Sequence, residues 1–249
     1  MAFIIALAGK GGTGKTTMAA LLVRALVERK AGSVLAVDAD PNSNLGEVLG
    51  VTGEQTIGQV LDEVGANPDK VPGGMTKDRY IEYKVQTSVL EGNGFDVLTM
   101  GKPEGPGCYC YVNNVLRNVV DKLINDYTYV VIDNEAGLEH LSRRTTRRAD
   151  ALLVIAHNTP VALRAAQRIS ALADDLKIKI GQKLLLLNAS DSGIAPELLA
   201  DVKLQYAGSI PDDDTVAQLS ASGEPVWKLP ARAPAYQAVQ KFAEEMILK

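Results

Sequence analysis

The amino-acid sequence predicts one α/β domain, built on a mainly parallel, twisted sheet with helices on both faces. Short apolar runs alternate with helical patterns through almost the whole chain, as parallel strands joined by crossover helices require. The 249 residues are 46% hydrophobic and 22% charged, which is enough for one large domain with a substantial core. A glycine-rich segment, residues 9–17, separates the first apolar run from the first helical pattern.

The apolar runs predict the strands and the amphipathic stretches between them predict the helices. We expect strands at Phe3–Ala8, Ser33–Asp38, Phe95–Met100, Tyr129–Ile132, Ala151–Ala156, Lys183–Leu187 and Tyr206–Ile210. We expect helices at Lys15–Lys30, Val112–Asn125, Leu138–Ala149, Val161–Leu176, Pro196–Val202, Asp214–Ser220 and Ala235–Leu248. No internal repeat or interdomain linker interrupts this order, so residues 1–249 are expected to form a single domain.

The least regular part of the chain is the stretch from about residue 65 to residue 94. It is rich in proline and glycine, and we interpret it as an insertion into the domain. Tyr80–Leu90 within it is expected to be an extra strand, with antiparallel pairing as one option. No role for the insertion follows from its residues.

Composition narrows the class of protein. The net charge of −4 and the isoelectric point of about 5.3 argue against a general nucleic-acid binder, which usually carries a basic surplus. No stretch reaches the length of a transmembrane helix, and the apolar N-terminus lacks the basic region of a signal peptide. Two cysteines do not make a disulfide framework. We therefore expect a cytoplasmic protein with no nucleic-acid partner and no stable membrane association.

The glycine-rich segment fits the phosphate-loop pattern G-x-x-x-x-G-K-[ST]. Glycines allow the backbone to wrap a polyphosphate with its N–H groups pointing inward, and the strand before and helix after complete an anion site. Lys15 is positioned to reach the β- and γ-phosphates, and the Thr16 hydroxyl to bind Mg²⁺. The expected nucleotide-binding residues here are Gly11, Gly12, Thr13, Gly14, Lys15, Thr16 and Thr17.

A second lysine, Lys10, directly follows the first glycine of the loop. Its side chain starts on the far side of the turn, so the loop itself cannot use it. A lysine in this place is explained if it reaches the phosphates bound by a second, facing subunit. The segment therefore predicts a homodimer as well as a nucleotide site.

Acids and an amide follow several predicted strands, where parallel sheets place binding groups. Asp133 follows an apolar run in the Walker B pattern, and its carboxylate is expected to hold Mg²⁺ through water. Asp38 and Asp40 lie on the same side of a strand, so one can brace the Mg²⁺ region while the other orients attacking water. Taken alone, each aspartate could simply cap the next turn, but together with the loop they indicate catalysis.

With these motifs the sequence resembles the deviant Walker A class of P-loop ATPases, which includes MinD, ParA and the nitrogenase iron protein. The matching segments are Lys10–Thr17, Asp38–Pro41 and Asp133–Gly137. The resemblance implies ATP or ADP with Mg²⁺, a nucleotide-sandwich dimer in which Lys10 contacts phosphate across the interface, and Asp40 as the residue that positions water. It also implies an adenine-binding amide at Asn188 and an adenine-side loop at Pro211.

The segment Cys108-Tyr109-Cys110 offers a further clue to function. It precedes a predicted helix, whose N-terminus favours the thiolate form that binds metals. Two cysteines cannot complete a tetrahedral sulfur site, but a two-fold dimer doubles them to four. The alternative is a pair of ordinary, half-buried cysteines.

The combination resembles the CooC-like nickel-insertion ATPases, which mature carbon monoxide dehydrogenase, with a relative that serves acetyl-CoA synthase. The matching segments are Cys108–Cys110, Glu135–Leu141 and Arg143–Thr145. The resemblance implies Ni²⁺ held at the dimer interface by Cys108 and Cys110 of both subunits, and its delivery to one of those enzymes as client. Thiolates accept Zn²⁺ as readily, so Zn²⁺ stays open. One departure is His157-Asn158-Thr159-Pro160, where an acidic residue is expected before the proline.

Other interpretations remain open on the sequence. His140 and Glu139 are either transient metal ligands or ordinary helix residues. The cluster Arg143–Arg148 is either a solvated face or a docking site for an acidic partner or membrane. The chain as a whole is alternatively a positioning ATPase of the MinD/ParA kind, although its C-terminal segment lacks the basic amphipathic character of a membrane anchor. It is alternatively an iron–sulfur cluster carrier or, less favoured, a reductase.

Overall fold

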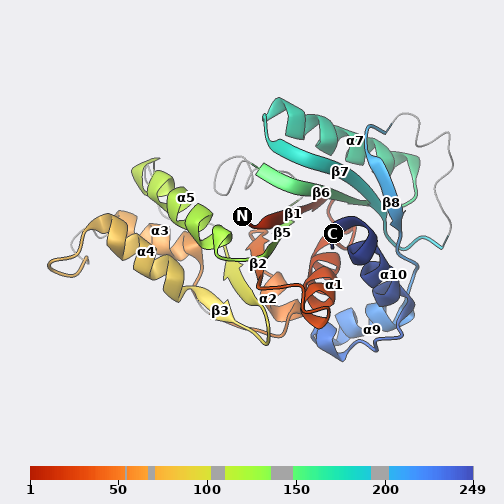
Figure 1. The fold of residues 1–249 in the computed structure, drawn as a ribbon, viewed down its shortest axis with the longest axis horizontal. Coiled ribbons are helices and arrows are strands. Elements are labelled where there is room, and N and C mark those ends of the chain that lie inside the picture. The colour runs from red at the N-terminus through yellow and green to blue at the C-terminus, as the bar shows by residue number, and fades with distance from the viewer. Residues whose placement is uncertain (54, 67–70, 102–109, 136–147, 192–201, 249) are drawn as a thin grey trace.

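An eight-stranded sheet runs through the part of the chain that the computed structural model describes, residues 1–53, 55–66, 71–101, 110–135, 148–191 and 202–248 (Figure 1). The strand order is β3-β4-β2-β5-β1-β6-β7-β8. Neighbouring strands pair in parallel, except that β3 is antiparallel to β4. The strands are β1 (Phe3–Gly9), β2 (Val34–Ala39), β3 (Val89–Glu91), β4 (Asp96–Thr99), β5 (Tyr129–Asn134), β6 (Arg148–Ala156), β7 (Lys179–Leu187) and β8 (Gln205–Ser209).

Helices cover both faces of this sheet, as the sequence predicts. The helical segments are α1 (Lys15–Glu28), α2 (Leu45–Val48), α3 (Ile57–Ala66), α4 (Lys77–Thr87), α5 (Cys110–Asn125), α7 (Pro160–Asp175), α9 (Asp214–Ser222), η2 (Val226–Lys228), α10 (Pro234–Phe242) and η3 (Ala243–Ile247). One face packs against α3, α4, α5 and α7, and the other against α1, α2, η2 and α10 (Figure 1). The predicted α/β fold, mainly parallel and covered on both sides, is confirmed.

The central strands explain why the core divides into two layers. Along β1, Ile4 and Ala6 belong to one layer, and Ile5 and Leu7 belong to the other. Successive side chains of a strand point to opposite faces, so a strand buried on both sides must be apolar throughout. This is the physical reason that the unbroken apolar runs identified the strands.

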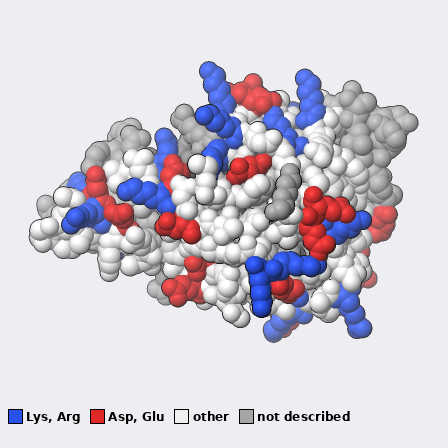
Figure 2. All heavy atoms as spheres, viewed as in Figure 1, with Lys and Arg blue, Asp and Glu red and all other residues white. Residues whose placement is uncertain are grey.

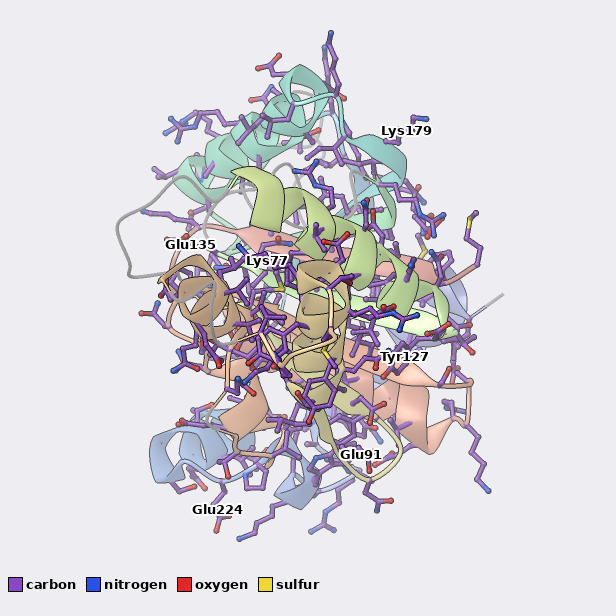
Figure 3. The ribbon with its side chains drawn as sticks, turned by 90° about the vertical axis from the view of Figure 1, so that its left-hand side faces the viewer. Lys77, Glu91, Tyr127, Glu135, Lys179 and Glu224 are labelled. Carbon is purple, nitrogen blue, oxygen red and sulfur yellow. The ribbon has the colours of Figure 1, made fainter. Side chains whose placement is uncertain are left out.

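The carboxyl ends of the parallel strands meet at one edge of the sheet. Tyr127 precedes β5 and Glu135 follows it, and the two lie at opposite sides of the molecule in Figure 3. Lys179, which begins β7, lies on the same side as Tyr127. The edge marked by Glu135 is therefore the carboxyl edge, where the residues after β1, β2, β5 and β7 gather.

The expectation of a strand at Tyr80–Leu90 is wrong for most of its length. Helix α4 occupies Lys77–Thr87, with the Thr76 hydroxyl accepting a hydrogen bond from the Arg79 N–H at its start. The buried residues Ile81 and Val85 are four positions apart, which is the spacing of one face of a helix. The segment is helical because it packs on α3 and α5 instead of entering the sheet. Only β3 is extended, and it carries the antiparallel pairing.

Other boundaries also differ from the prediction. Helices α2 and α3 were not expected, and β7 begins at Lys179, before its apolar run. The predicted helix Leu138–Ala149 is wrong at its end, because β6 already begins at Arg148; its residues 138–147 lie outside the described part. Residues 196–201 of the predicted helix Pro196–Val202 also lie outside it. Among the helices that the structure describes, none has the length and apolar character needed to span a membrane.

Candidate nucleotide site

The phosphate-loop segment forms a tight turn between β1 and α1 at the carboxyl edge of the sheet. Gly14 directly precedes α1 and has a left-handed conformation, with a φ of 84°, in which a side chain would cause strain. A Cβ there would stand 2.4 Å from Nδ2 of Asn188. At Gly9 a Cβ would stand 2.5 Å from the carbonyl oxygen of Ile155 in the paired strand β6. Both glycines are therefore required by close approaches that the motif alone did not reveal.

One backbone carbonyl organises the loop. The carbonyl oxygen of Lys10 accepts a hydrogen bond from the Thr13 hydroxyl at 2.9 Å, and a longer one from Nζ of Lys15 at 3.5 Å. Lys15 is buried, whereas Lys10 is exposed. The two lysines therefore face different surroundings: Lys15 belongs to its own loop, and the side chain of Lys10 is accessible to another molecule.

Two buried aspartates lie side by side beneath the loop. Asp38 and Asp133 are partners in the pairing of β2 with β5, and both are almost fully buried. Burial raises the pKa of Asp38 from 3.8 to about 7, and the negative charge of Asp133 adds to this effect. The backbone N–H groups of Leu45 and Asp40 donate to the Asp38 carboxylate at 2.8 and 3.1 Å, which opposes the shift. Asp38 therefore braces the loop that follows β2.

Asp133 has a different environment. Burial raises its pKa from 3.8 to about 6, while Thr16 and the positive charge of Lys15 lower it. Within the described residues, neither carboxylate oxygen of Asp133 has a hydrogen bond of normal geometry. A buried carboxylate with so little hydrogen bonding, next to the Thr16 hydroxyl, is a set of oxygen groups that suits Mg²⁺. Thr16 and Asp133 thus fit the metal that accompanies a nucleoside triphosphate.

Asp40 lies in the loop after β2 and is partly exposed. Its carboxylate oxygen Oδ1 accepts hydrogen bonds from the backbone N–H and the side-chain amide of Asn42, both at 2.9 Å. It is close enough for its charge to raise the pKa of Asp133. The structure therefore places Asp40 near the phosphate loop but turned toward its own loop, and its role in orienting water stays a prediction.

A hollow with a cavity volume of about 150 Å³, open to solvent, adjoins the phosphate loop. The two residues predicted for the base side, Asn188 and Pro211, both line it. Nδ2 of Asn188 donates to the carbonyl oxygen of Thr13 at 2.9 Å, which links the end of β7 to the phosphate loop. Gly14, apolar side chains and a few polar groups complete the lining, and the other residues are Thr17, Met18, Leu21, Ala189, Ile210, Asp212, Asp213, Val216, Ala217 and Ala235.

The structure adds residues that sequence reasoning missed. Nδ2 of Asn134 donates to the carbonyl oxygen of Leu7 at 2.9 Å and so joins β5 to β1 under the loop. The carboxylate of Asp213 accepts from the N–H groups of Thr215 and Ala235, which fixes the starts of α9 and α10 beside the hollow. In the sequence, Asn134 could have been found only from its position at the end of a predicted strand. Asp213 could have been found only from its position just before a predicted helix, where aspartate is a common cap.

Several predicted residues cannot be placed. Cys108, Gly137, Glu139, His140 and the arginines from Arg143 to Arg147 lie outside the described residues. Cys110 is the first residue of α5, but its side chain is not described. Arg148 begins β6 and donates to the carbonyl oxygen of Ala2, so it is part of the sheet and not of a helical basic face. The cysteine metal site therefore stays a prediction.

A mainly parallel sheet whose first strand runs into a glycine loop and a helix, with a buried aspartate at the carboxyl end of a neighbouring strand, defines a P-loop nucleotide hydrolase. Residues 4–226 match the family described as the CobQ/CobB/MinD/ParA nucleotide binding domain, and the chain belongs to that family. It is accordingly an ATPase of the MinD/ParA class.

Three relatives show how far the likeness extends. An ATP-binding protein of Methanocaldococcus jannaschii, itself uncharacterised, is 42% identical over 255 residues, covering 99% of each chain. The carbon monoxide dehydrogenase accessory protein CooC of Rhodospirillum rubrum is 30% identical over 231 residues, covering 88% of this chain and 87% of its own. The solved cell division ATPase MinD of Pyrococcus furiosus is 26% identical, with a TM-score of 0.72 over 99% of this chain and 98% of its own.

Proposed function

We propose that the chain is an ATP-dependent metallochaperone that delivers Ni²⁺ to carbon monoxide dehydrogenase or acetyl-CoA synthase. The observation that carries the proposal is the likeness to a carbon monoxide dehydrogenase accessory protein over 88% of the chain, together with Cys108-Tyr109-Cys110 in the sequence. Thiolates are suitable ligands for Ni²⁺, which is here the cargo and not a resident cofactor.

In this proposal the ATPase site supplies the energy for delivery. The N–H groups of the phosphate loop and Lys15 bind the phosphates, and Thr16 and Asp133 hold Mg²⁺, which offsets charge on the β- and γ-phosphates. Asp40 orients the attacking water once it leaves Asn42, to which it is now bonded. The hollow beside Asn188 and Pro211 accommodates the base, and its apolar side chains Leu21 and Val216 suit a flat aromatic ring.

The proposal requires a homodimer, because two sulfur ligands from each chain complete a four-thiolate site. Lys10 gives a test that is independent of the metal. If Lys10 acts on the nucleotide of the partner, Lys10→Ala and Lys15→Ala each lose ATPase activity, and a mixture of the two recovers part of it. In the mixed dimer one site combines an intact loop with an intact partner Lys10. If the mixture stays as inactive as its components, Lys10 acts on the nucleotide of its own subunit.

The metal content of the purified chain tests whether Ni²⁺ is the cargo. The chain is purified without oxygen, titrated with Ni²⁺ and measured for metal per chain, together with Cys108→Ser, Cys110→Ser and Lys15→Ala. We expect one Ni²⁺ per two chains in the wild type and in Lys15→Ala, which keeps both thiols, and none in either cysteine variant. Ni²⁺ affinity should also differ between the ATP-bound and ADP-bound forms. A brown, iron-containing preparation would indicate an iron–sulfur carrier instead, and equal metal binding by all variants would contradict the cysteine site.

A positioning ATPase of the MinD kind is the second candidate, supported by the likeness to the Pyrococcus furiosus structure. Such a protein needs a surface for a membrane or DNA. In the described C-terminal segment, Phe242, Ala243 and Ile247 are buried against the sheet and so are not available to a lipid surface. Acidic and basic side chains are interspersed on the face seen in Figure 2. Co-sedimentation with anionic liposomes or DNA in the presence of ATP separates the two candidates.

A further inference from the structure

The segment after β6 contains His157, whose ring contacts the end of the neighbouring strand β7. Nδ1 of His157 lies 3.2 Å from the backbone carbonyl oxygen of Asn188. A carbonyl oxygen can only accept, so Nδ1 must carry the proton and donate. The imidazole keeps a proton on Nδ1 in this arrangement whether the ring is neutral or charged. His157 is thus a fixed donor to the peptide that joins Asn188 to Ala189.

That peptide belongs to a strained turn. Ala189 has a φ of 49°, in the left-handed region that residues with a Cβ rarely adopt. The turn is bounded by two further backbone bonds, from the Asn188 N–H to the carbonyl oxygen of Ala156 at 2.9 Å and from the Ser190 N–H to that of Ile210 at 3.0 Å. Strained backbone persists only where its surroundings hold it. His157 adds a side-chain hydrogen bond to the backbone bonds that hold this turn.

The same turn aims the Asn188 side chain at the phosphate loop. Its Nδ2 donates to the Thr13 carbonyl oxygen at 2.9 Å, and Thr13 in turn donates to the carbonyl oxygen of Lys10 at 2.9 Å. The fit is close, because a Cβ on Gly14 would collide with that amide. Because Nδ2 faces Thr13, the oxygen Oδ1 is the acceptor that this side chain can offer a ligand in the hollow.

We propose that His157 is a positioning residue for nucleotide binding. Its Nδ1–H fixes the Asn188–Ala189 peptide, and the Asn188 side-chain amide can then hold the phosphate loop in place beside the hollow that takes the base. The inference rests on the proposed placement of the nucleotide in this site. A carboxylate in place of this histidine would face the Asn188 carbonyl oxygen with no proton to donate.

Asparagine and glutamine offer a matched pair of substitutions. In asparagine the amide nitrogen is bonded to Cγ, as Nδ1 is in histidine, so His157→Asn keeps a donor in nearly the same place. In His157→Gln the amide lies one bond farther out, near the position of Nε2, and the donor is lost. His157→Ala removes the donor altogether. Each purified variant is compared with the wild type for ADP affinity, using a fluorescent ADP analogue, for KM and kcat of ATP hydrolysis, and for the melting temperature without nucleotide.

We expect His157→Gln and His157→Ala to weaken ADP binding about fivefold and to raise KM similarly, the size expected for one lost hydrogen bond, with kcat within about twofold of wild type. His157→Asn should bind within about twofold of wild type. Equal affinity in all variants, or an Asn variant as weak as the Gln variant, would overturn the inference. So would losses in melting temperature alone, which would indicate only a structural role. If the wild type itself binds no nucleotide, the proposed function fails and the inference with it.

Discussion

Arg24 joins α1 to the segment around η2 and to α10, and its loss should lower the stability of the domain. It lies in the middle of α1 and is only 5% exposed. Its Nη1 donates to the carbonyl oxygens of Val226 and Leu229, both at 2.7 Å, and its Nε donates to the Glu28 carboxylate at 2.7 Å. Its guanidinium lies 4.1 Å from the ring centre of Tyr236, whose hydroxyl donates to the same carboxylate.

The perturbation we consider is Arg24→Met, which keeps an apolar stem of similar length. It leaves two buried carbonyl oxygens without their donor, at about 1–3 kcal/mol each. The ion pair with the partly exposed Glu28 adds less than about 1 kcal/mol, and the lost cation–π contact adds about 1 kcal/mol. Relief from burying a charge offsets part of this sum. We therefore expect a loss of about 3–4 kcal/mol in the free energy of unfolding, or about 10 °C in Tm for a domain of this size.

Thermal unfolding of the nucleotide-free protein, followed by circular dichroism, measures this loss. Arg29→Met is the matched control, because Arg29 directly follows the end of α1 but pairs with Glu244 at the exposed surface. Its Tm should change by no more than about 3 °C. If Arg24→Met melts as Arg29→Met does, the buried network contributes little and the reasoning is refuted.

Two further predictions concern the site itself. Because burial raises the pKa of Asp38 to about 7, the folded chain keeps a proton that the unfolded chain has lost between about pH 4 and pH 7, so the free energy of unfolding falls as pH rises through that window. Urea unfolding at pH 5 and pH 8 should show a drop that is smaller in Asp38→Asn by on the order of 2–3 kcal/mol, and an equal drop in both proteins would contradict the assignment. Gly14→Ala should weaken ADP binding at least about 100-fold, because its left-handed φ and the clash with Asn188 both resist a Cβ. Gly73→Ala, where a Cβ meets nothing within 4 Å, should bind as wild type does, and comparable binding by the two variants would refute the geometric argument.

Much of the fold and the centre of the site could be predicted because their signals are local. The strands of a doubly covered sheet must be apolar at every position, and the loop between β1 and α1 has a fixed spacing of glycines and lysine. The pairing of Asp38 with Asp133 follows once both end parallel strands that are neighbours. The strand predicted at Tyr80–Leu90 failed because a short segment can satisfy either period, and its helical neighbours decided between them.

The sequence by itself determined the class of fold, the phosphate loop and the acids around it, because a few adjacent residues suffice to express each of them. Only the tertiary structure decided that His157 bonds to the end of β7, that the Asn188 amide holds the phosphate loop and that Arg24 secures the chain at Val226 and Leu229. The residues joined in these contacts are 31, 175 and 202 positions apart in the sequence. No local sequence pattern can predict such contacts, because they depend on the order of the strands in the sheet.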